Sequence, residues 1–371
     1  MAKYIGIKLE EEKPMTAEED FLKDFSMEEL KSELVARGAQ LPGEKRFKLR
    51  AWPGTPISEV IIGGTDELTA KIPSLSSHPL LKKISMEKLV KALIFRADEM
   101  GIEGNRGIWG PDGRVDIYEI EDDEIKANAG CVAAICKKNK LCEEKKGFTT
   151  LKVKSFKDAQ KVSDSERFCH QPTYAGWIAT GFLVEKDVIA TAAHCAEKNN
   201  LDNLRFIFGY KMLNADTALT EIPNNKVYRG VEIIERYYNR EGIQPDWALV
   251  RLDRKVKGQT VARLSAGDIC LGLPVYAIGH PLGLPLKAAP GAYVCDVNET
   301  CFVADLDIFS GNSGSPVFRS DTGEVIGIVA RGDRDLKSTP SGFTSVVYPN
   351  FKIPGKGPQC TRISKAMIDH F

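Results

Sequence analysis

The sequence predicts a mainly β protein preceded by a smaller, largely helical N-terminal region. Beyond Gly110, short runs of β-branched and apolar residues alternate with turns that contain glycine and proline, a texture typical of all-β barrels and sandwiches. Before that point, capping motifs precede apolar residues that recur at helical spacing. The texture changes near residue 105, so we expect residues 1–104 and 105–371 to form separate regions.

Composition and charge narrow the class of protein. The 371 residues are 43% hydrophobic and include 51 Lys+Arg and 51 Asp+Glu, so the net charge is zero. This balance gives no electrostatic reason to expect a nucleic acid or an anionic membrane surface as a partner. The sequence holds no apolar run long enough to span a bilayer, and its N-terminus lacks the apolar stretch of a secretory signal. We therefore expect a cytoplasmic protein.

The helices expected in residues 1–104 begin at recognisable caps. Thr16 and Ser26 each open a capping box, and Ser85 precedes an apolar helix face that runs to about residue 100. Residues 51–82 are rich in proline and glycine, a spacing that predicts loops and short strands. An acidic stretch in the first helices fits a solvated face, and the alternative is a docking site for a basic partner. We expect this region to regulate the rest of the chain or to bind a regulatory protein.

The strands expected in the β-rich region follow one another at short intervals. They cover residues 114–120, 181–184, 188–191, 204–208, 249–252, 275–278, 292–295, 301–304, 315–318, 324–330 and 342–347. Thr361 is the expected N-cap of a short C-terminal helix.

The nine cysteines favour free thiols. Their number is odd and small for the length, unlike that of a disulfide-stabilised scaffold. Cys131, Cys136 and Cys142 are separated by gaps longer than the two residues of a zinc knuckle, so we expect no metal site.

Three segments of the β-rich region carry residues suited to nucleophilic chemistry. They are Thr191–Cys195, which contains His194; Asp246–Leu252, which begins with an aspartate; and Gly311–Val317, which contains Ser313. Each segment alone fits a structural turn or the end of a strand. Their joint occurrence, in the order His, Asp, Ser, is much harder to obtain by chance.

These segments resemble the motifs of the chymotrypsin-like serine peptidases. They read T-A-A-H-C around the base, D-x-A-L around the acid and G-N-S-G-x-P around the nucleophile. Residues 110–120, 165–168 and 278–285 also resemble the bacterial trypsin-like branch. The resemblance covers residues 106–371 and implies a chymotrypsin-like double six-stranded β-barrel with a C-terminal helix and an active site between the barrels. It implies no cofactor.

The resemblance also implies a role for each catalytic residue. His194 would be the general base that takes the proton of Ser313 and later protonates the leaving amine. Asp246 would hold the imidazole in the right tautomer and stabilise the imidazolium. The backbone N–H groups of Gly311 and Ser313 would form the oxyanion hole.

Three positions depart from the pattern of secreted relatives. Cys195 lacks its usual disulfide partner, because Ala179 stands where the relatives have a cysteine, and Phe309 replaces another cysteine. The missing bridges fit a reducing compartment. Asn312 replaces the aspartate that pairs with a newly cut N-terminus in digestive relatives. We therefore expect a protease that needs no N-terminal cleavage.

The resemblance places the primary specificity pocket around Asp307, six residues before Ser313. An aspartate at the base of this pocket would select Arg or Lys before the cut bond. The alternative is that Asp307 is a loop or strand-end residue. Ala330, Arg331 and Gly332 would line the substrate backbone, with Arg331 in place of the usual aromatic residue, and Gly332 and Gly342 would form pocket walls.

The sequence thus predicts a serine endopeptidase that cuts proteins after Arg or Lys under the control of residues 1–104 or of a partner. Limited proteolysis in bacterial stress or defence signalling follows by analogy alone. Two alternatives stay open: a catalytically silent binding module that kept the fold, and a secreted trypsin-like enzyme. His280, in a turn, is expected to be structural.

Overall fold

A computed structural model of the chain describes most of the region expected to be rich in β-strands. The described residues are 107–145, 147–174, 176, 178–238, 245–332, 335–348, 357–363 and 367. The helical region expected over residues 1–104 lies outside them, as does most of the segment expected to form a C-terminal helix.

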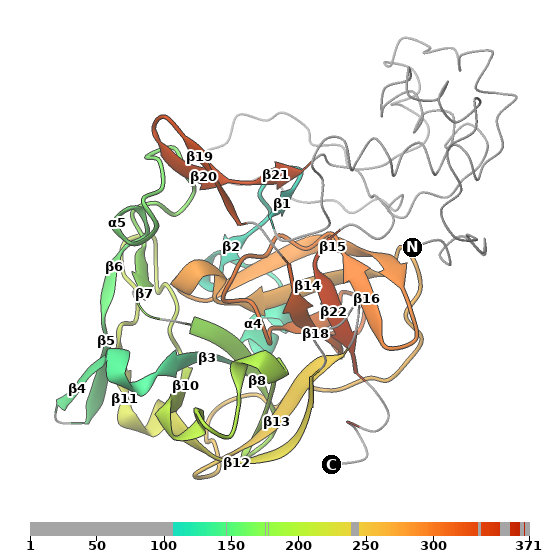
Figure 1. The fold of residues 1–371 in the computed structure, drawn as a ribbon, viewed down its shortest axis with the longest axis horizontal. Coiled ribbons are helices and arrows are strands. Elements are labelled where there is room, and N and C mark those ends of the chain that lie inside the picture. Colours follow the sequence, from blue (N-terminus) through green and yellow to red (C-terminus); the bar gives the residue numbers. More distant parts are fainter. Residues whose placement is uncertain are drawn as a thin grey trace, which may run out of the picture. The chain divides into compact units, whose positions relative to one another are not determined.

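The first half of the described chain forms a closed six-stranded barrel (Figure 1). Around the barrel the strands follow the order β10-β12-β13-β9-β8-β3. Their bounds are β3 (Val132–Lys137), β8 (Ile178–Glu185), β9 (Val188–Thr191), β10 (Leu204–Phe208), β12 (Val227–Tyr238) and β13 (Asp246–Leu252).

The second half forms another ring of six strands. The order is β14-β17-β18-β22-β16-β15, and β14 also pairs with β15, which closes the ring. The bounds are β14 (Pro274–Gly279), β15 (Lys287–Val297), β16 (Cys301–Ala304), β17 (Pro316–Arg319), β18 (Val325–Arg331) and β22 (Gln359–Arg362). A short strand, β2 (Val115–Asp116), adds to the free side of β15. The expected double six-stranded β-barrel is confirmed.

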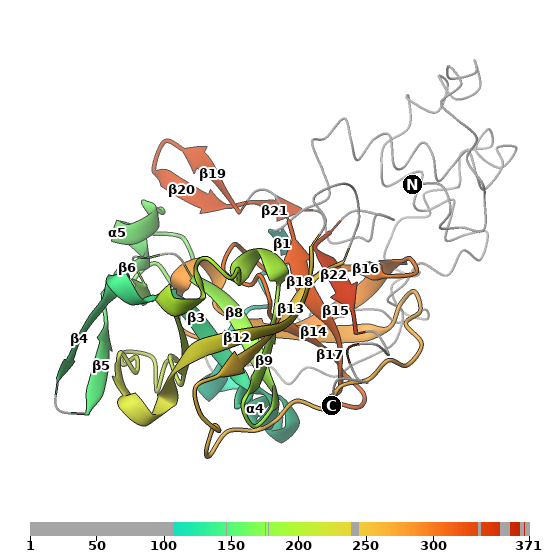
Figure 2. The same ribbon diagram turned by 60° about the horizontal axis from the view of Figure 1, so that its bottom comes forward.

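Smaller elements decorate the barrels. β4 (Leu141–Lys145), β5 (Phe148–Leu151) and β11 (Glu221–Pro223) form one sheet, and the pairs are β1 (Ile108–Trp109) with β21 (Val347–Tyr348), β6 (Val153–Ser155) with β7 (Pro172–Tyr174), and β19 (Leu336–Thr339) with β20 (Gly342–Ser345). The α-helices are α4 (Asp123–Ala129) and α5 (Phe156–Gln160), and the 3-10 turns are η4 (Ile117–Glu119), η5 (Lys138–Lys140), η6 (Ala193–Cys195), η7 (Leu201–Asn203), η8 (Asn224–Lys226) and η9 (Pro281–Gly283). Figures 1 and 2 both show the β19–β20 hairpin beside α5, where Val162 bridges to Phe343.

One cluster of buried hydrophobic residues spans the two barrels. Strand β8 is buried over all but its last residue, since one face fills its own barrel and the other packs outside it. The same cluster of buried residues includes Phe182 and Phe206 of the first barrel and Tyr276 and Ile328 of the second. Burial of this shared surface fixes the two barrels relative to each other, and with them the residues at their junction.

The structure corrects two of the expected elements. Only Val115–Asp116 of the strand expected over residues 114–120 is extended, because the Glu119 side chain accepts a hydrogen bond from the Asp116 N–H and starts η4. Thr361 is not a helix N-cap. It lies inside β22, paired with both β16 and β18, and the ladder partners on its two sides keep the chain extended there.

We predict that Gly327→Ala destabilises the second barrel. A Cβ atom on Gly327 would lie 2.4 Å from the Phe302 ring and 3.0 Å from the Thr361 carbonyl oxygen. Phe302 is buried in the core and the carbonyl belongs to a paired strand, so neither can move away cheaply. The expected loss is about 1–3 kcal/mol of unfolding free energy in urea titrations.

The matched control is Gly267→Ala, because that glycine is exposed and its Cβ would meet only the Ser265 hydroxyl. The control should change stability by no more than about 0.5 kcal/mol. Equal stability of Gly327→Ala and the wild type would contradict the packing described here.

Candidate active site

The three residues with expected catalytic roles come from both barrels. His194 lies in η6, directly after β9, and Asp246 is the first residue of β13. β9 and β13 are paired strands, with Thr191 opposite Ala248, so their adjoining ends place His194 beside Asp246. Ser313 comes from the second barrel, in the loop between β16 and β17.

Asp246 holds His194 through both of its carboxylate oxygens. His194 Nδ1 lies 2.6 Å from Asp246 Oδ2, and the His194 backbone N–H donates to Oδ1 at 3.1 Å. The Asp246 side chain is fully buried, whereas the His194 side chain is 30% exposed. A carboxylate at Nδ1 favours the tautomer with the proton on Nδ1, which leaves Nε2 as the basic ring nitrogen.

Thr361 of the second barrel fixes the backbone at Asp246. Its hydroxyl accepts a hydrogen bond from the Asp246 N–H at 2.9 Å and lies 3.3 Å from the Asp246 carbonyl oxygen, to which it donates. Sequence patterns missed this role, because the two residues are 115 positions apart in the chain.

The turn that carries Ser313 requires glycine at Gly311. Gly311 has φ of +99°, and a Cβ atom there would lie 2.3 Å from the His280 carbonyl oxygen. A side chain is therefore excluded by both backbone conformation and space. Asn312, which stands where digestive relatives have an aspartate, is buried. Its side-chain oxygen accepts a hydrogen bond from the Ser315 hydroxyl at 3.3 Å.

Thr180 of β8 joins the first barrel to this turn. Its N–H donates to the Ser313 carbonyl at 2.9 Å, and its hydroxyl donates to the Gly311 carbonyl at 2.7 Å. The same hydroxyl accepts the His280 N–H at 3.2 Å. No sequence pattern pointed to this residue, which directly precedes the strand expected over residues 181–184. Thr180 thus fixes the backbone on both sides of Asn312.

One pocket of about 380 Å³ brings the expected site residues together. His194, Gly311 and Ser313 all line it. The other lining residues are Gln160, Gly176, Ile178, Ala179, Cys195, Leu282 and Ser310. Leu282 was not expected there; it adopts a positive φ of 50°, and its N–H donates to the Ser310 carbonyl. The pocket therefore combines a base, a hydroxyl and a glycine turn in a partly apolar recess.

Asp307 does not line this pocket. Its carboxylate is buried, and its two oxygens accept the N–H groups of Trp109 and Gly113, each at 2.7 Å. Burial raises the pKa of Asp307 to about 7, against the opposing effect of the two N–H donors. These contacts favour the loop-fixing alternative for Asp307 over a role at the base of a specificity pocket.

The other residues expected to bind substrate lie on or next to β18, beside the serine turn, or in the β19–β20 hairpin. Ala330 and Arg331 end β18, which runs beside Ser313 because the Gly314 N–H donates to the Val329 carbonyl at 2.7 Å. Gly332 follows this strand. Gly342 has φ of +121° and packs against the backbone of residues 161–163. None of the four lines the pocket at Ser313, and their roles remain predictions.

His280 is a buried, neutral histidine. Its ring stacks on Tyr210 with the ring centroids 5.9 Å apart, and its Nδ1 has no hydrogen-bond partner. Burial lowers the pKa of His280 to about 3. The structural role expected for this residue fits these contacts.

No disulfide forms among the cysteines that the structure describes, Cys195 included. Cys195 Sγ lies 3.9 Å from the Ser313 carbonyl oxygen, so this side chain packs against the backbone at Ser313. Within the same residues, no group of three or more His, Cys, Asp or Glu side chains is placed to hold a metal ion.

Comparison with known proteins finds similarity to proteases. Residues 179–328 match the family model of the trypsin-like peptidase domain. A trypsin-like protease of Streptomyces glaucescens is 27% identical over 194 residues, which cover 45% of this chain and 69% of that protein.

Solved structures of proteases are also similar to this chain. A Glu endopeptidase aligns with a TM-score of 0.39 and 15% identity, over 71% of this chain and 96% of its own. A scabies mite inactivated protease paralogue aligns with a TM-score of 0.43 and 13% identity, over 71% of this chain and 95% of its own. Among the residues that the structure describes, no helix is both long and apolar enough to cross a membrane.

We predict that Thr180→Val destabilises the double-barrel fold. Valine has nearly the same shape but leaves the Gly311 carbonyl and the His280 N–H without their partner, in a site from which water is excluded. The expected loss is about 1–3 kcal/mol of unfolding free energy. Thr180→Ser keeps the hydroxyl and should lose clearly less; equal losses in the two variants would rule out the hydrogen bonds as the cause.

We also predict that His280 contributes to a loss of folding stability in acid. The unfolded chain binds a proton at this residue below its ordinary pKa of 6.5, whereas the folded chain does so only near 3. The unfolded state therefore binds more protons between these values, and stability falls as pH drops from 6.5 towards 3, by up to a few kcal/mol. His280→Phe, which keeps a ring against Tyr210, should reduce this fall.

The comparison requires urea unfolding of both proteins at pH 7 and pH 4. His170→Asn is the control, because His170 is exposed and its replacement should leave the pH dependence as in the wild type. The same loss of stability in wild type and His280→Phe would show that protonation elsewhere dominates.

Proposed function

We propose that this chain is a serine endopeptidase that cleaves protein substrates through an acyl-enzyme. One observation carries the proposal: the buried Asp246 carboxylate is paired with Nδ1 of His194, and His194 shares a pocket with Ser313 and Gly311. A serine hydroxyl is a poor nucleophile by itself, and an oriented imidazole is the base that activates it.

The proposed reaction uses each group in turn. Nε2 of His194 takes the proton of Ser313 Oγ as the oxygen attacks the carbonyl carbon of the substrate. The N–H groups of Gly311 and Ser313 bind the resulting oxyanion. His194 then gives its proton to the leaving amine as the peptide bond breaks, and a water molecule, activated by the same imidazole, hydrolyses the acyl-enzyme.

Asp246 acts through His194. Its carboxylate is desolvated and holds His194 by two contacts, one to ring Nδ1 and one to the backbone N–H, so the imidazolium that forms during the reaction has a fixed counter-charge. Asn312 is neutral and has a partner in Ser315, so no new charged N-terminus is required to satisfy it. The proposal is therefore an enzyme that is competent without N-terminal cleavage. Control by residues 1–104, a cytoplasmic location and a signalling role remain predictions of the sequence.

We predict that Ser313→Ala abolishes peptidase activity and labelling by a fluorophosphonate probe. The probe reacts covalently with an activated serine hydroxyl, and alanine leaves no nucleophile. The rate should fall by roughly a thousandfold or more, while the melting temperature stays close to that of the wild type. The measurements are gel fluorescence after labelling, casein hydrolysis and thermal unfolding.

The control variant is Ser320→Ala, because this serine is exposed on the second barrel, away from the pocket. It should label as fast as the wild type. Absence of labelling in folded wild-type protein would support a silent binding module, and equal labelling of Ser313→Ala would refute the assignment of the nucleophile.

A further inference from the structure

The strongest feature outside the catalytic pocket is the contact between Asp307 and the start of the peptidase domain. We call residues 107–113 the lead-in segment. Both oxygens of the Asp307 carboxylate are occupied by backbone donors of this segment, 194 and 198 positions away in the chain. Only 8% of Asp307 is exposed, so a carboxylate that lost these donors would find little water to replace them.

The lead-in segment is held to the second barrel at several points besides Asp307. The Gly107 N–H donates to the Ile308 carbonyl at 3.1 Å, next to Asp307 itself. The Ile108 N–H donates to the Val346 carbonyl at 2.9 Å, where β1 pairs with β21. The Trp109 ring stacks on Tyr348 with the ring centroids 4.8 Å apart. The lead-in segment is therefore fixed to the rest of the fold along its length.

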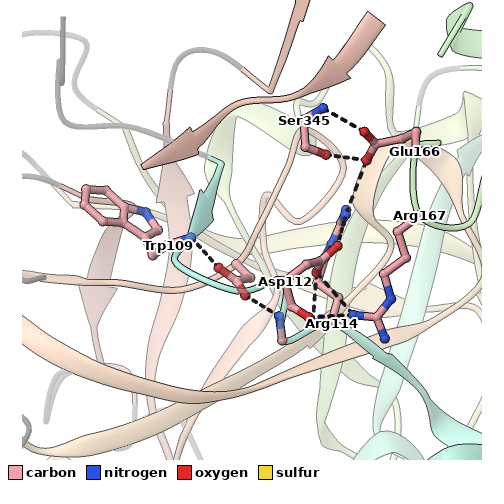
Figure 3. A network of polar contacts seen from close by, with 8 residues as sticks. Trp109, Asp112, Arg114, Glu166, Arg167 and Ser345 are labelled. Carbon is pink, nitrogen blue, oxygen red and sulfur yellow. Dashed lines mark hydrogen bonds and ion pairs between the residues drawn. The ribbon is translucent and has the colours of Figure 1, made fainter. Parts of the chain in front are cut away.

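Arg114 directly follows the lead-in segment and belongs to a network of charged side chains (Figure 3). Its fully buried guanidinium binds Asp112 through two hydrogen bonds, of 2.9 and 2.7 Å. Glu166 lies 3.8 Å away and accepts the Ser345 N–H at 2.8 Å. The guanidinium also lies 4.3 Å from the centre of the Phe309 ring, so the network touches the chain just before the catalytic serine.

The chain on the far side of Asp307 leads directly to the catalytic turn. We call residues 305–310 the nucleophile loop. The Asn312 N–H donates to the Phe309 carbonyl at 3.0 Å, and the Ser310 carbonyl accepts the Leu282 N–H at the edge of the pocket. A shift of Asp307 or Phe309 would therefore reach Gly311 and Ser313 through the backbone, with no side chain in between.

We propose that Asp307 is a positioning residue for the reaction: its carboxylate holds the lead-in segment against the nucleophile loop and so keeps the Gly311–Ser313 turn in its catalytic shape. This inference rests on the proposed peptidase function. It differs from a role in substrate selection, because both carboxylate oxygens already face backbone donors of the protein itself.

Asp307→Asn tests the proposal with little change of shape. The amide keeps one acceptor, but its NH₂ group must face one of the two N–H donors, so one hydrogen bond becomes a repulsive contact. We expect kcat to fall by roughly tenfold or more, because the oxyanion donors move, while KM changes by less than about threefold. The preference among peptide nitroanilides with Arg, Lys, Glu, Phe or Leu before the cut should not change.

Amide hydrogen exchange gives a readout that does not depend on activity. Peptides covering residues 107–113 should lose protection in Asp307→Asn, with protection in β8 and β13 unchanged. Gly113→Ala supplies a second variant that leaves Asp307 intact, since its Cβ would crowd the Asp307 carboxylate at 3.2 Å. It should change kcat and exchange in the same direction, by less. Asp321→Asn, an exposed carboxylate on the same barrel, should behave as the wild type.

The outcomes separate this inference from the proposed function. A loss confined to Arg and Lys substrates, or a wild-type kcat with full protection of the lead-in segment, would overturn the positioning role. Wild-type protein that neither labels with the fluorophosphonate nor cleaves any of the peptides would instead refute the peptidase function. In that case, amide hydrogen exchange in Asp307→Asn still decides whether the carboxylate holds the lead-in segment.

Discussion

The arrangement of the site depends on Thr180, where a strand of the first barrel is hydrogen-bonded to the turn of the second. Its N–H and hydroxyl hold the carbonyls of Ser313 and Gly311, and its own carbonyl accepts the Thr191 hydroxyl. Gly314 fits into this junction only because it has no side chain, since a Cβ atom would lie 2.1 Å from the Thr180 carbonyl oxygen. Buried hydrogen bonds of this kind are costly to break, so the serine turn is tied to the first barrel.

The second barrel also forms hydrogen bonds to the site residues of the first. Thr361, on a strand of the second barrel, holds the backbone of Asp246, which belongs to the first. Each barrel therefore fixes the backbone at a proposed catalytic residue that the other barrel carries. Two contacts therefore hold the serine turn. Thr180 of the first barrel bonds to it directly, and in our proposal the lead-in segment, bound to Asp307, supports it from the other side. Such redundancy suits a site whose geometry has to be fixed before substrate arrives.

Much of the fold was predictable because its strands carry local signals. The strand expected over residues 188–191 coincides with β9, and the one expected over residues 204–208 coincides with β10. The long strand β12 escaped prediction, because most of its residues are exposed or half-buried and charged residues interrupt its apolar pattern. Thr361 was misassigned as a helix cap because its strand is fixed by pairing with two strands that are distant in the chain.

The sequence by itself determined which residues are candidates for catalysis, because His194, Asp246 and Ser313 each stand in a short, recognisable motif. The tertiary structure alone decided what surrounds them. Thr180 meets Gly311 across 131 positions of chain, and Asp307 meets its donors across nearly two hundred. The sequence does not show which hydrogen-bond donors a carboxylate will meet. Whether it binds a substrate or the protein's own backbone depends on the donors that folding brings to it. For Asp307 these are the N–H groups of Trp109 and Gly113.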